Sequence, residues 1–137
     1  MKQKVSDYIA EYIAQWGIRD VFTVTGGGAM HMNDAFGHHP KLHCTYQHHE
    51  QACAMAAEAY ARMDNRMAAV CVTTGPGATN AITGVLGGWM DSIPMLVFSG
   101  QARYATTVPA SGLPLRSMGV QECNICLLYT SPSPRDT

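Results

Sequence analysis

Charged residues and long apolar runs are both scarce in this chain of 137 residues. Charged side chains make up 14% of the chain and the net charge is −1, so no basic patch indicates nucleic acid as a partner. No apolar run approaches the ~18 residues that a membrane-spanning helix needs. The start of the chain is amphipathic and charged, without the apolar centre of a signal peptide. We therefore expect no nucleic acid and no membrane as partners.

A disulfide framework and a zinc site are also not indicated. The five cysteines are odd in number and irregularly spaced, which favours a reducing compartment and hence a cytoplasmic protein. The Cys123-x-x-Cys126 spacing has no second pair, and no H-E-x-x-H motif is present. We therefore predict no metal site and expect surface or turn positions for the histidines, which are His31, His38, His39, His43, His48 and His49.

Apolar residues make up 47% of the chain, enough for one domain with a hydrophobic core. Short β-branched or aromatic runs predict strands at residues 20–25, 42–46, 68–73 and 95–99. Helical periodicity alternates with them, at about residues 5–16, 29–36, 52–63 and 80–90. This alternation with short connections predicts an α/β fold, a three-layer α/β/α structure with a parallel sheet.

The pattern fades after residue 101, and residues 102–122 are predicted to form an irregular loop. The final segment, residues 126–137, contains Ser-Pro-Ser-Pro, which cannot continue a strand or a helix. We therefore expect a domain over residues 1–125 that is incomplete at its C-terminal end. Residues 126–137 are expected to be a non-native or disordered tail.

Spacing also predicts which side of two helices is apolar. On the first helix this face comprises Val5, Tyr8, Ile9, Tyr12, Ile13 and Trp16. On the third it comprises Ala52, Met55, Ala56, Ala59, Tyr60 and Met63. The last helix contains Gly84, Gly87 and Gly88, which lower helix propensity and therefore suggest close packing.

Four loops leave the carboxyl ends of the predicted strands, where parallel α/β folds usually bind ligands. They comprise residues 26–28, 47–50, 74–79 and 100–101. The triple glycine at 26–28 fits neither G-x-G-x-x-G nor a P-loop, so we expect a tight turn or a close approach to a ligand. Thr74 and Asn80 place polar side chains beside the Gly-Pro-Gly turn.

Glu50 has two interpretations. Its carboxyl group could act chemically on a bound cofactor, at the point where a loop enters an alanine-rich helix. Alternatively, it is a first-turn glutamate that interacts favourably with the positive end of a helix dipole. Local sequence alone favours the second interpretation.

Three segments, in this order and spacing, resemble the N-terminal pyrimidine-binding (PYR) domain of thiamine-diphosphate-dependent enzymes. They are VFTVTGGGAMHMNDAF, YQHHEQACAMAAEAYAR and VTTGPGATNAITGVLGGWMDSIPMLVFSGQ. Among these enzymes the chain is most similar to the acetolactate synthase large-subunit group. The resemblance covers about residues 1–125, and the combination of segments is far more specific than any one of them.

The resemblance implies a catalytic role for Glu50, as the carboxyl group that hydrogen-bonds N1′ of the cofactor's aminopyrimidine. The loop that packs around this ring would comprise Thr74, Gly75, Pro76, Gly77 and Asn80. Residues near the substrate side of the cofactor would be Gly26, Gly27, Gly28, Gln101 and Gln121. Gln121 and Glu122 match the end of a Phe-Gln-Glu motif, in which Val120 replaces the aromatic residue.

The activity implied by the resemblance is carboligation or decarboxylation of a 2-keto acid such as pyruvate, as in branched-chain amino acid biosynthesis. A carboxyl group at N1′ favours the imino form of the pyrimidine, which promotes loss of the thiazolium C2 proton and attack on the keto carbon. Thiamine diphosphate is the implied cofactor. Its Mg²⁺ would be held by a domain carrying a GDG…N motif that this chain lacks, and FAD is possible in the full-length enzyme.

The resemblance further implies a homodimer or homotetramer and an inactive fragment. Two alternatives stay open. One is a non-catalytic α/β binding module that dimerises through the alanine-rich and glycine-rich helices. The other is a different thiamine-diphosphate-dependent decarboxylase, of the benzoylformate, oxalyl-CoA or sulfopyruvate type.

Overall fold

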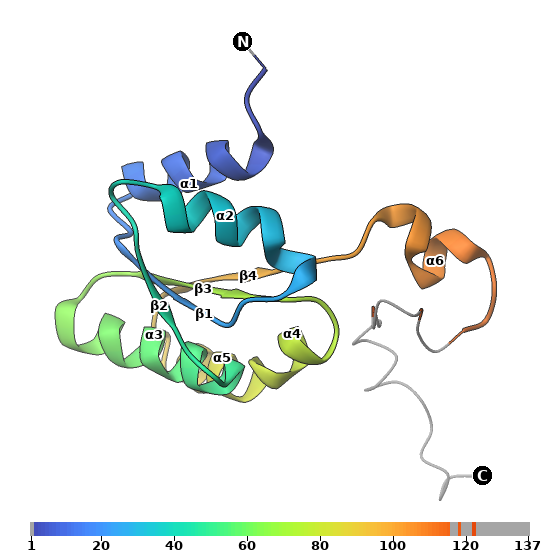
Figure 1. Cartoon of the computed structure of the whole chain (residues 1–137). Coiled ribbons are helices and arrows are strands. Elements are labelled where there is room, and N and C mark those ends of the chain that lie inside the picture. The colour runs from blue at the N-terminus through green and yellow to red at the C-terminus, as the bar shows by residue number, and fades with distance from the viewer. Residues whose placement is uncertain (1, 116–117, 119–121, 123–137) are drawn as a thin grey trace, which may run out of the picture. The chain divides into compact units, whose positions relative to one another are not determined.

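The computed structural model describes residues 2–115, 118 and 122 (Figure 1). The chain divides into two compact units, Met1–Gln101 and Ala102–Thr137. Gln121, Cys123, Cys126 and the expected tail at 126–137 lie outside the described residues.

The first unit alternates helices and strands, as the sequence predicts. Its elements are α1 (Val5–Gln15), β1 (Asp20–Thr23), the 3₁₀ turn η1 (Gly27–Ala29), α2 (Met30–His38), β2 (His43–Tyr46), α3 (Glu50–Asp64), β3 (Ala68–Val72), α4 (Pro76–Asn80), α5 (Ile82–Met90) and β4 (Met95–Ser99). One difference lies at residues 74–79, predicted as a turn. Most of it forms α4, because Pro76 supplies a helix-compatible φ at a position where no N–H is needed.

All four strands are parallel and lie in the order β2-β1-β3-β4. The chain moves outward from β1 to β2 and then returns to place β3 on the other side of β1. The direction of winding therefore reverses between β1 and β3. In open α/β sheets, this switch point is where ligands bind, just beyond the carboxyl ends of the strands.

Helices cover both faces of the sheet, with α1 and α2 on one side and α3, α4 and α5 on the other (Figure 1). Every residue of β3 is buried, and the period of two divides its side chains between the two sides. Ala69 and Cys71 join the core beneath α1 and α2. Ala68, Val70 and Val72 join the core beneath α3 and α5. The predicted three-layer α/β/α fold is thus confirmed.

The predicted apolar face of α1 is largely wrong. Val5, Tyr8, Tyr12 and Trp16 are exposed. Ile13 is buried and Ile9 partly buried as predicted, and the other buried residues of the helix are the smaller Ser6 and Ala10. The outer aromatic rings contact one another instead: Tyr8 and Tyr12 are stacked with ring centroids 5.9 Å apart, and Tyr12 and Trp16 are tilted with ring centroids 5.1 Å apart. Small side chains let the helix approach its neighbours closely, and the large ones are left outside.

The predicted face of α3 is also largely wrong, although Tyr60 is partly buried and packs against the core. Met55 and Met63 are exposed, whereas the buried residues are Cys53, Ala54, Ala57 and Ala61. This face of small residues packs closely against α5, as the sequence analysis predicted from the glycines of that helix. A Cβ atom on Gly84 would lie 2.6 Å from the Cβ atom of Ala54.

The second unit contains a 3₁₀ turn, η2 (Tyr104–Thr106), and a single helical turn, α6 (Val108–Ser111). These lie inside the segment predicted as an irregular loop. Glu122 is 5% exposed, and its Oε2 atom accepts a hydrogen bond of 2.9 Å from the Val108 N–H. Across the described residues of both units, no helix combines the length and the apolar character needed to cross a membrane.

Candidate functional site

The loops that follow β1 and β3 meet at the switch point of the sheet. The Gly28 N–H donates a hydrogen bond of 3.0 Å to Oγ1 of Thr73, the first residue after β3. Thr73 thereby joins the triple-glycine loop to the Gly-Pro-Gly turn. Both loops were predicted to be near a ligand, and the structure brings them into contact.

Contacts that leave no room for a side chain explain three of the glycines. A Cβ atom on Gly26 would lie 2.5 Å from Thr73 Cβ, and one on Gly77 would lie 2.6 Å from Thr73 Cγ2. A Cβ atom on Gly100 would lie 2.5 Å from the carbonyl group of Gly28. Real Cβ atoms do not approach other atoms so closely. Gly26 and Gly77 therefore pack their backbones against the Thr73 side chain, and Gly100 packs its backbone against that of Gly28.

Gly75 has a conformational reason to be glycine. Its φ of 60° and ψ of −123° fall in a region that L side chains rarely adopt. This residue turns the chain sharply from β3 into α4. The turn sets Pro76 at the helix start and directs Asn80 toward α3.

Glu50 is the first residue of α3 and is half-buried. Its Oε2 atom accepts a hydrogen bond of 2.7 Å from Nδ2 of Asn80. Its Oε1 atom lies toward Gly77, 3.5 Å from where a Cβ atom would stand on that residue. One carboxyl oxygen therefore accepts a hydrogen bond from an amide, and the other lies beside the backbone of Gly77.

Thr74 and Gln101 form the remaining polar contact of the site. The Thr74 hydroxyl donates to Oε1 of Gln101 over 2.9 Å. Gln101 follows Gly100 directly after β4, so this bond joins the loops after β3 and β4.

Most of the sequence-predicted site residues therefore lie together at the carboxyl ends of the strands. Contacts connect Glu50, Gly26, Gly28, Thr74, Gly77, Asn80 and Gln101, with Gly75 and Pro76 between them in the chain. At Gly27, no atom lies within 4 Å of a built Cβ position. Gln121 lies outside the described residues. Sequence reasoning missed Thr73, although the adjacent threonines Thr73-Thr74 were visible, and it placed Gly100 in a ligand-binding loop without giving it a role.

The histidines are either exposed to solvent or form contacts away from Glu50. His48 and His49, beside Glu50, are exposed. His39 Nε2 lies 3.0 Å from Oε2 of Glu11, and this bond and one from Gln15 lower the pKa of Glu11, with the Gln15 bond the larger cause. No group of three or more metal-ligating side chains occurs among the described residues.

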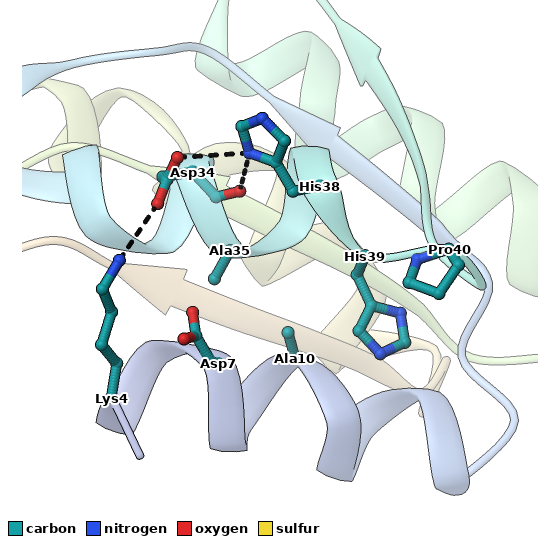
Figure 2. A pocket seen from close by; sticks show the side chains of 8 residues that line it. All are labelled: Lys4, Asp7, Ala10, Asp34, Ala35, His38, His39 and Pro40. Carbon is teal, nitrogen blue, oxygen red and sulfur yellow. Dashed lines mark hydrogen bonds and ion pairs between the residues drawn. The ribbon is translucent and has the colours of Figure 1, made fainter. Parts of the chain in front are cut away.

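A hollow between α1 and α2 is lined by charged side chains, shown in Figure 2. Asp34 lies between its two partners there, 3.5 Å from Lys4 Nζ and 3.2 Å from His38 Nδ1. None of the predicted site residues lines this hollow. Because Lys4, Asp34 and His38 pair with one another, we interpret the hollow as a polar junction between two helices.

The buried thiols are not candidates for a nucleophile. Burial raises the pKa of Cys71 to about 11, and burial followed by the nearby Glu50 charge raises that of Cys53 to about 11. A nucleophilic thiol needs the opposite change. Glu50, by contrast, is half-buried and contacts the loop after β3 through Asn80.

Comparison with known proteins gives one family and a set of named relatives. Residues 3–124 match the family described as thiamine pyrophosphate enzyme, N-terminal TPP binding domain. Acetolactate synthase 2, chloroplastic, of Zea mays is 38% identical over 72% of this chain, which is 16% of its own length. The acetolactate synthase large subunits of Lactococcus lactis and of Buchnera aphidicola from Schizaphis graminum are 35% and 40% identical, each over 70% of this chain and 17% of their own length. The chain thus spans about one sixth of these relatives.

Proposed function

This chain belongs to the family of N-terminal thiamine pyrophosphate-binding domains of thiamine pyrophosphate enzymes, and we propose that it forms the cofactor-activating part of an acetolactate synthase-like enzyme. The proposed substrate is a 2-keto acid such as pyruvate. The names of the relatives support this substrate class. Thiamine diphosphate, another name for thiamine pyrophosphate, is the proposed cofactor.

The observation that carries the proposal is the arrangement of Glu50. A carboxyl group that hydrogen-bonds an aminopyrimidine needs one oxygen held in place and the other accessible to a flat ring. Asn80 holds Oε2 at 2.7 Å, and Oε1 has no hydrogen-bond partner among the described residues. A carboxyl group with one oxygen held and the other without a protein partner suits a hydrogen bond to the pyrimidine half of the cofactor.

The protein's own residues then have distinct roles. Glu50 would hold the proton shared with the pyrimidine nitrogen, while Gly75, Pro76 and Gly77 would pack against the ring. The loop of residues 26–28 would border the substrate. When bound, the cofactor supplies a nucleophilic carbon and an electron sink for 2-keto acid chemistry.

The remaining parts of the proposed enzyme lie outside this chain. The diphosphate would be held through Mg²⁺ by another domain, as the resemblance to thiamine-diphosphate-dependent enzymes implies. We further propose a cytoplasmic homodimer or homotetramer, with FAD as a possible additional cofactor. The chain alone is not expected to turn over substrate.

The proposal is tested by changing Glu50 to Gln in the full-length enzyme. The amide has nearly the same shape but cannot exchange a proton, so we expect kcat with pyruvate to fall about 100- to 10,000-fold, the usual contribution of acid–base catalysis. Product formation and carbon dioxide release would be measured with saturating thiamine diphosphate and Mg²⁺.

Glu58→Gln is the matched control on the same helix. Its side chain pairs with Arg62 through two hydrogen bonds of 3.0 and 2.7 Å, and activity should be nearly unchanged. Near-full activity in the Glu50→Gln enzyme would contradict the proposed role of Glu50. A full-length wild-type protein that does not act on any 2-keto acid would contradict the proposed substrate class.

A second candidate is a non-catalytic module that dimerises through α3 and α5. Exposed large apolar residues on these helices favour it, namely Met55, Met63, Leu86, Trp89 and Met90. The same exposure is expected if other domains of the enzyme cover these helices. A stop codon directly downstream in independent reads would favour the module over the enzyme.

A further inference from the structure

We infer that Thr73 is a positioning residue whose hydroxyl holds the loop of residues 26–28 and whose methyl group sets the place of Gly77 beside Glu50. The inference rests on the proposed function for its catalytic consequences. Its geometric content stands on contacts within the first unit alone.

Thr73 is attached to a rigid base. It directly follows β3, whose residues are all buried and which pairs with β1 on one side and β4 on the other. The Gly100 N–H extends this pairing by donating to the Val72 carbonyl over 2.8 Å. A side chain on this base can therefore hold the more irregular loops around it.

The hydroxyl controls the loop after β1. Oγ1 accepts the Gly28 N–H at 3.0 Å, and a Cβ atom on Gly26 would lie 2.7 Å from the same oxygen. The loop is thus hydrogen-bonded to Thr73 through Gly28 and packs against Thr73 at Gly26. Loss of the acceptor would leave the Gly28 N–H without this partner and free the loop to move.

The methyl group controls the turn after β3. Cγ2 lies 2.6 Å from the position of a Cβ atom on Gly77, whereas the next neighbours, Glu50 Oε1 and Thr73 Cβ, lie at 3.5 and 3.7 Å. The methyl group is therefore the one atom that forbids a side chain there. It also forms the wall against which Gly77 rests beside the carboxyl group of Glu50.

Two single variants of the full-length enzyme separate these roles. Thr73→Val keeps the shape and removes the acceptor, so KM for pyruvate should rise about fivefold, the scale of one lost hydrogen bond, with little change in cofactor affinity. Thr73→Ser keeps the hydroxyl and removes the methyl group, so the dissociation constant of thiamine diphosphate should rise about fivefold, with little change in KM. Equilibrium dialysis with Mg²⁺ gives the cofactor affinity independently of turnover.

The geometry is tested in the 137-residue chain without any ligand. The Gly28 amide should exchange its hydrogen about fivefold faster in Thr73→Val than in wild type or Thr73→Ser. Gly77→Ala should lower the urea midpoint strongly in wild type and much less in a Thr73→Ser background. Gly26→Ala is the control, because Thr73 Cβ, 2.5 Å away, remains in the serine variant and no rescue is expected.

The outcomes separate this inference from the proposed function. Equal Gly28 exchange rates in all three proteins, or equal damage by Gly77→Ala in both backgrounds, would overturn the geometric role of Thr73. An active wild-type enzyme in which Thr73→Val and Thr73→Ser change the same parameter to the same extent would overturn the division of roles. A full-length wild type without activity on 2-keto acids would overturn the proposed function only, since the exchange and rescue results would stand.

Discussion

Cys71 is a residue whose surroundings make the stability of the protein depend on pH. It is fully buried in β3, and burial raises the pKa of its thiol to about 11 from an ordinary value of 9.0. Below pH 9 the thiol is neutral in both the folded and the unfolded chain. Between about pH 9 and 11, the unfolded chain loses the thiol proton while the folded chain keeps it, so the free energy of unfolding falls as pH rises.

We therefore predict that the Cys71 thiol removes up to about 2–3 kcal/mol of stability between pH 9 and 11. Urea unfolding at several pH values would measure this slope for wild type and for Cys71→Ala, whose slope should be shallower. Cys44→Ala is the control, because Cys44 is only half-buried and should change the slope less. Parallel slopes for wild type and Cys71→Ala would contradict the prediction.

The sequence identified Glu50 and Asn80 as candidate site residues but gave no role to Thr73. Glu50 and Asn80 belong to recognisable segments, and the structure brings them to 2.7 Å. Thr73 was predicted as the end of a strand, because threonine fits a strand equally well. Its role depends in part on contacts with Gly26 and Gly28, which lie far away in the chain, and no local pattern contains these contacts.

The junction of α3 and α5 depends on single glycines, and two of them should respond oppositely to the same change. At Gly84, a Cβ atom would meet Ala54 Cβ at 2.6 Å and the Gln51 carbonyl oxygen at 3.0 Å, neither of which can easily move. Gly84→Ala should therefore lower the free energy of unfolding by about 1–3 kcal/mol through overpacking.

At Gly87, the nearest atom to a Cβ is Oε2 of Glu58 at 3.3 Å, on a side chain that can turn away. Alanine favours a helix over glycine by about 1 kcal/mol, so Gly87→Ala should be neutral or stabilising by up to that amount. Urea denaturation of both variants gives the comparison. A similar loss in both would mean that close packing does not distinguish the two positions.

Helix and strand positions were largely predictable, but the buried faces of α1 and α3 were not. Periodicity detects large apolar residues, so it selected Tyr8, Tyr12 and Trp16 on α1. Of the predicted face the structure buries Ile13, and beside it the small Ser6 and Ala10, which the pattern did not select. In closely packed layers the contact face is set by how near two backbones can come, and this favours small side chains that hydropathy hardly marks.

The exposed apolar surface of α3 and α5 gives a prediction for the whole molecule. Trp89 and Met90 are 75% and 70% exposed, and Met63 is 87% exposed. Contiguous exposed apolar residues favour association. The 137-residue chain should therefore self-associate as its concentration rises, which sedimentation velocity can measure.

Trp89→Glu should weaken this association by at least about tenfold, because a charge would be buried in the contact. Trp16→Glu is the matched control, since Trp16 is similarly exposed but directly follows α1, the helix that covers the opposite face of the sheet. If both variants weaken association equally, or if the wild-type chain stays monomeric throughout, the α3 and α5 surface is not the contact.

The class of fold followed from the alternation of strands and helices, but the order of the strands did not. Nothing local in Ala68–Val72 distinguishes a central strand from an edge strand, apart from the small residues Ala68 and Ala69. The order β2-β1-β3-β4 decides which loops meet. Because β1 and β3 are neighbours, the loops that follow them are in contact, and the triple glycine and the Gly-Pro-Gly turn lie in one site.

The central place of β3 also affects how the protein is made. β3 is the third strand to leave the ribosome, yet it supplies side chains to the cores on both faces of the sheet. Until residue 72 has emerged, β1 has an unpaired edge and neither core can close. Nascent chains that stall before this point should therefore expose unpaired strand edges that are prone to aggregation, and chaperones should bind them.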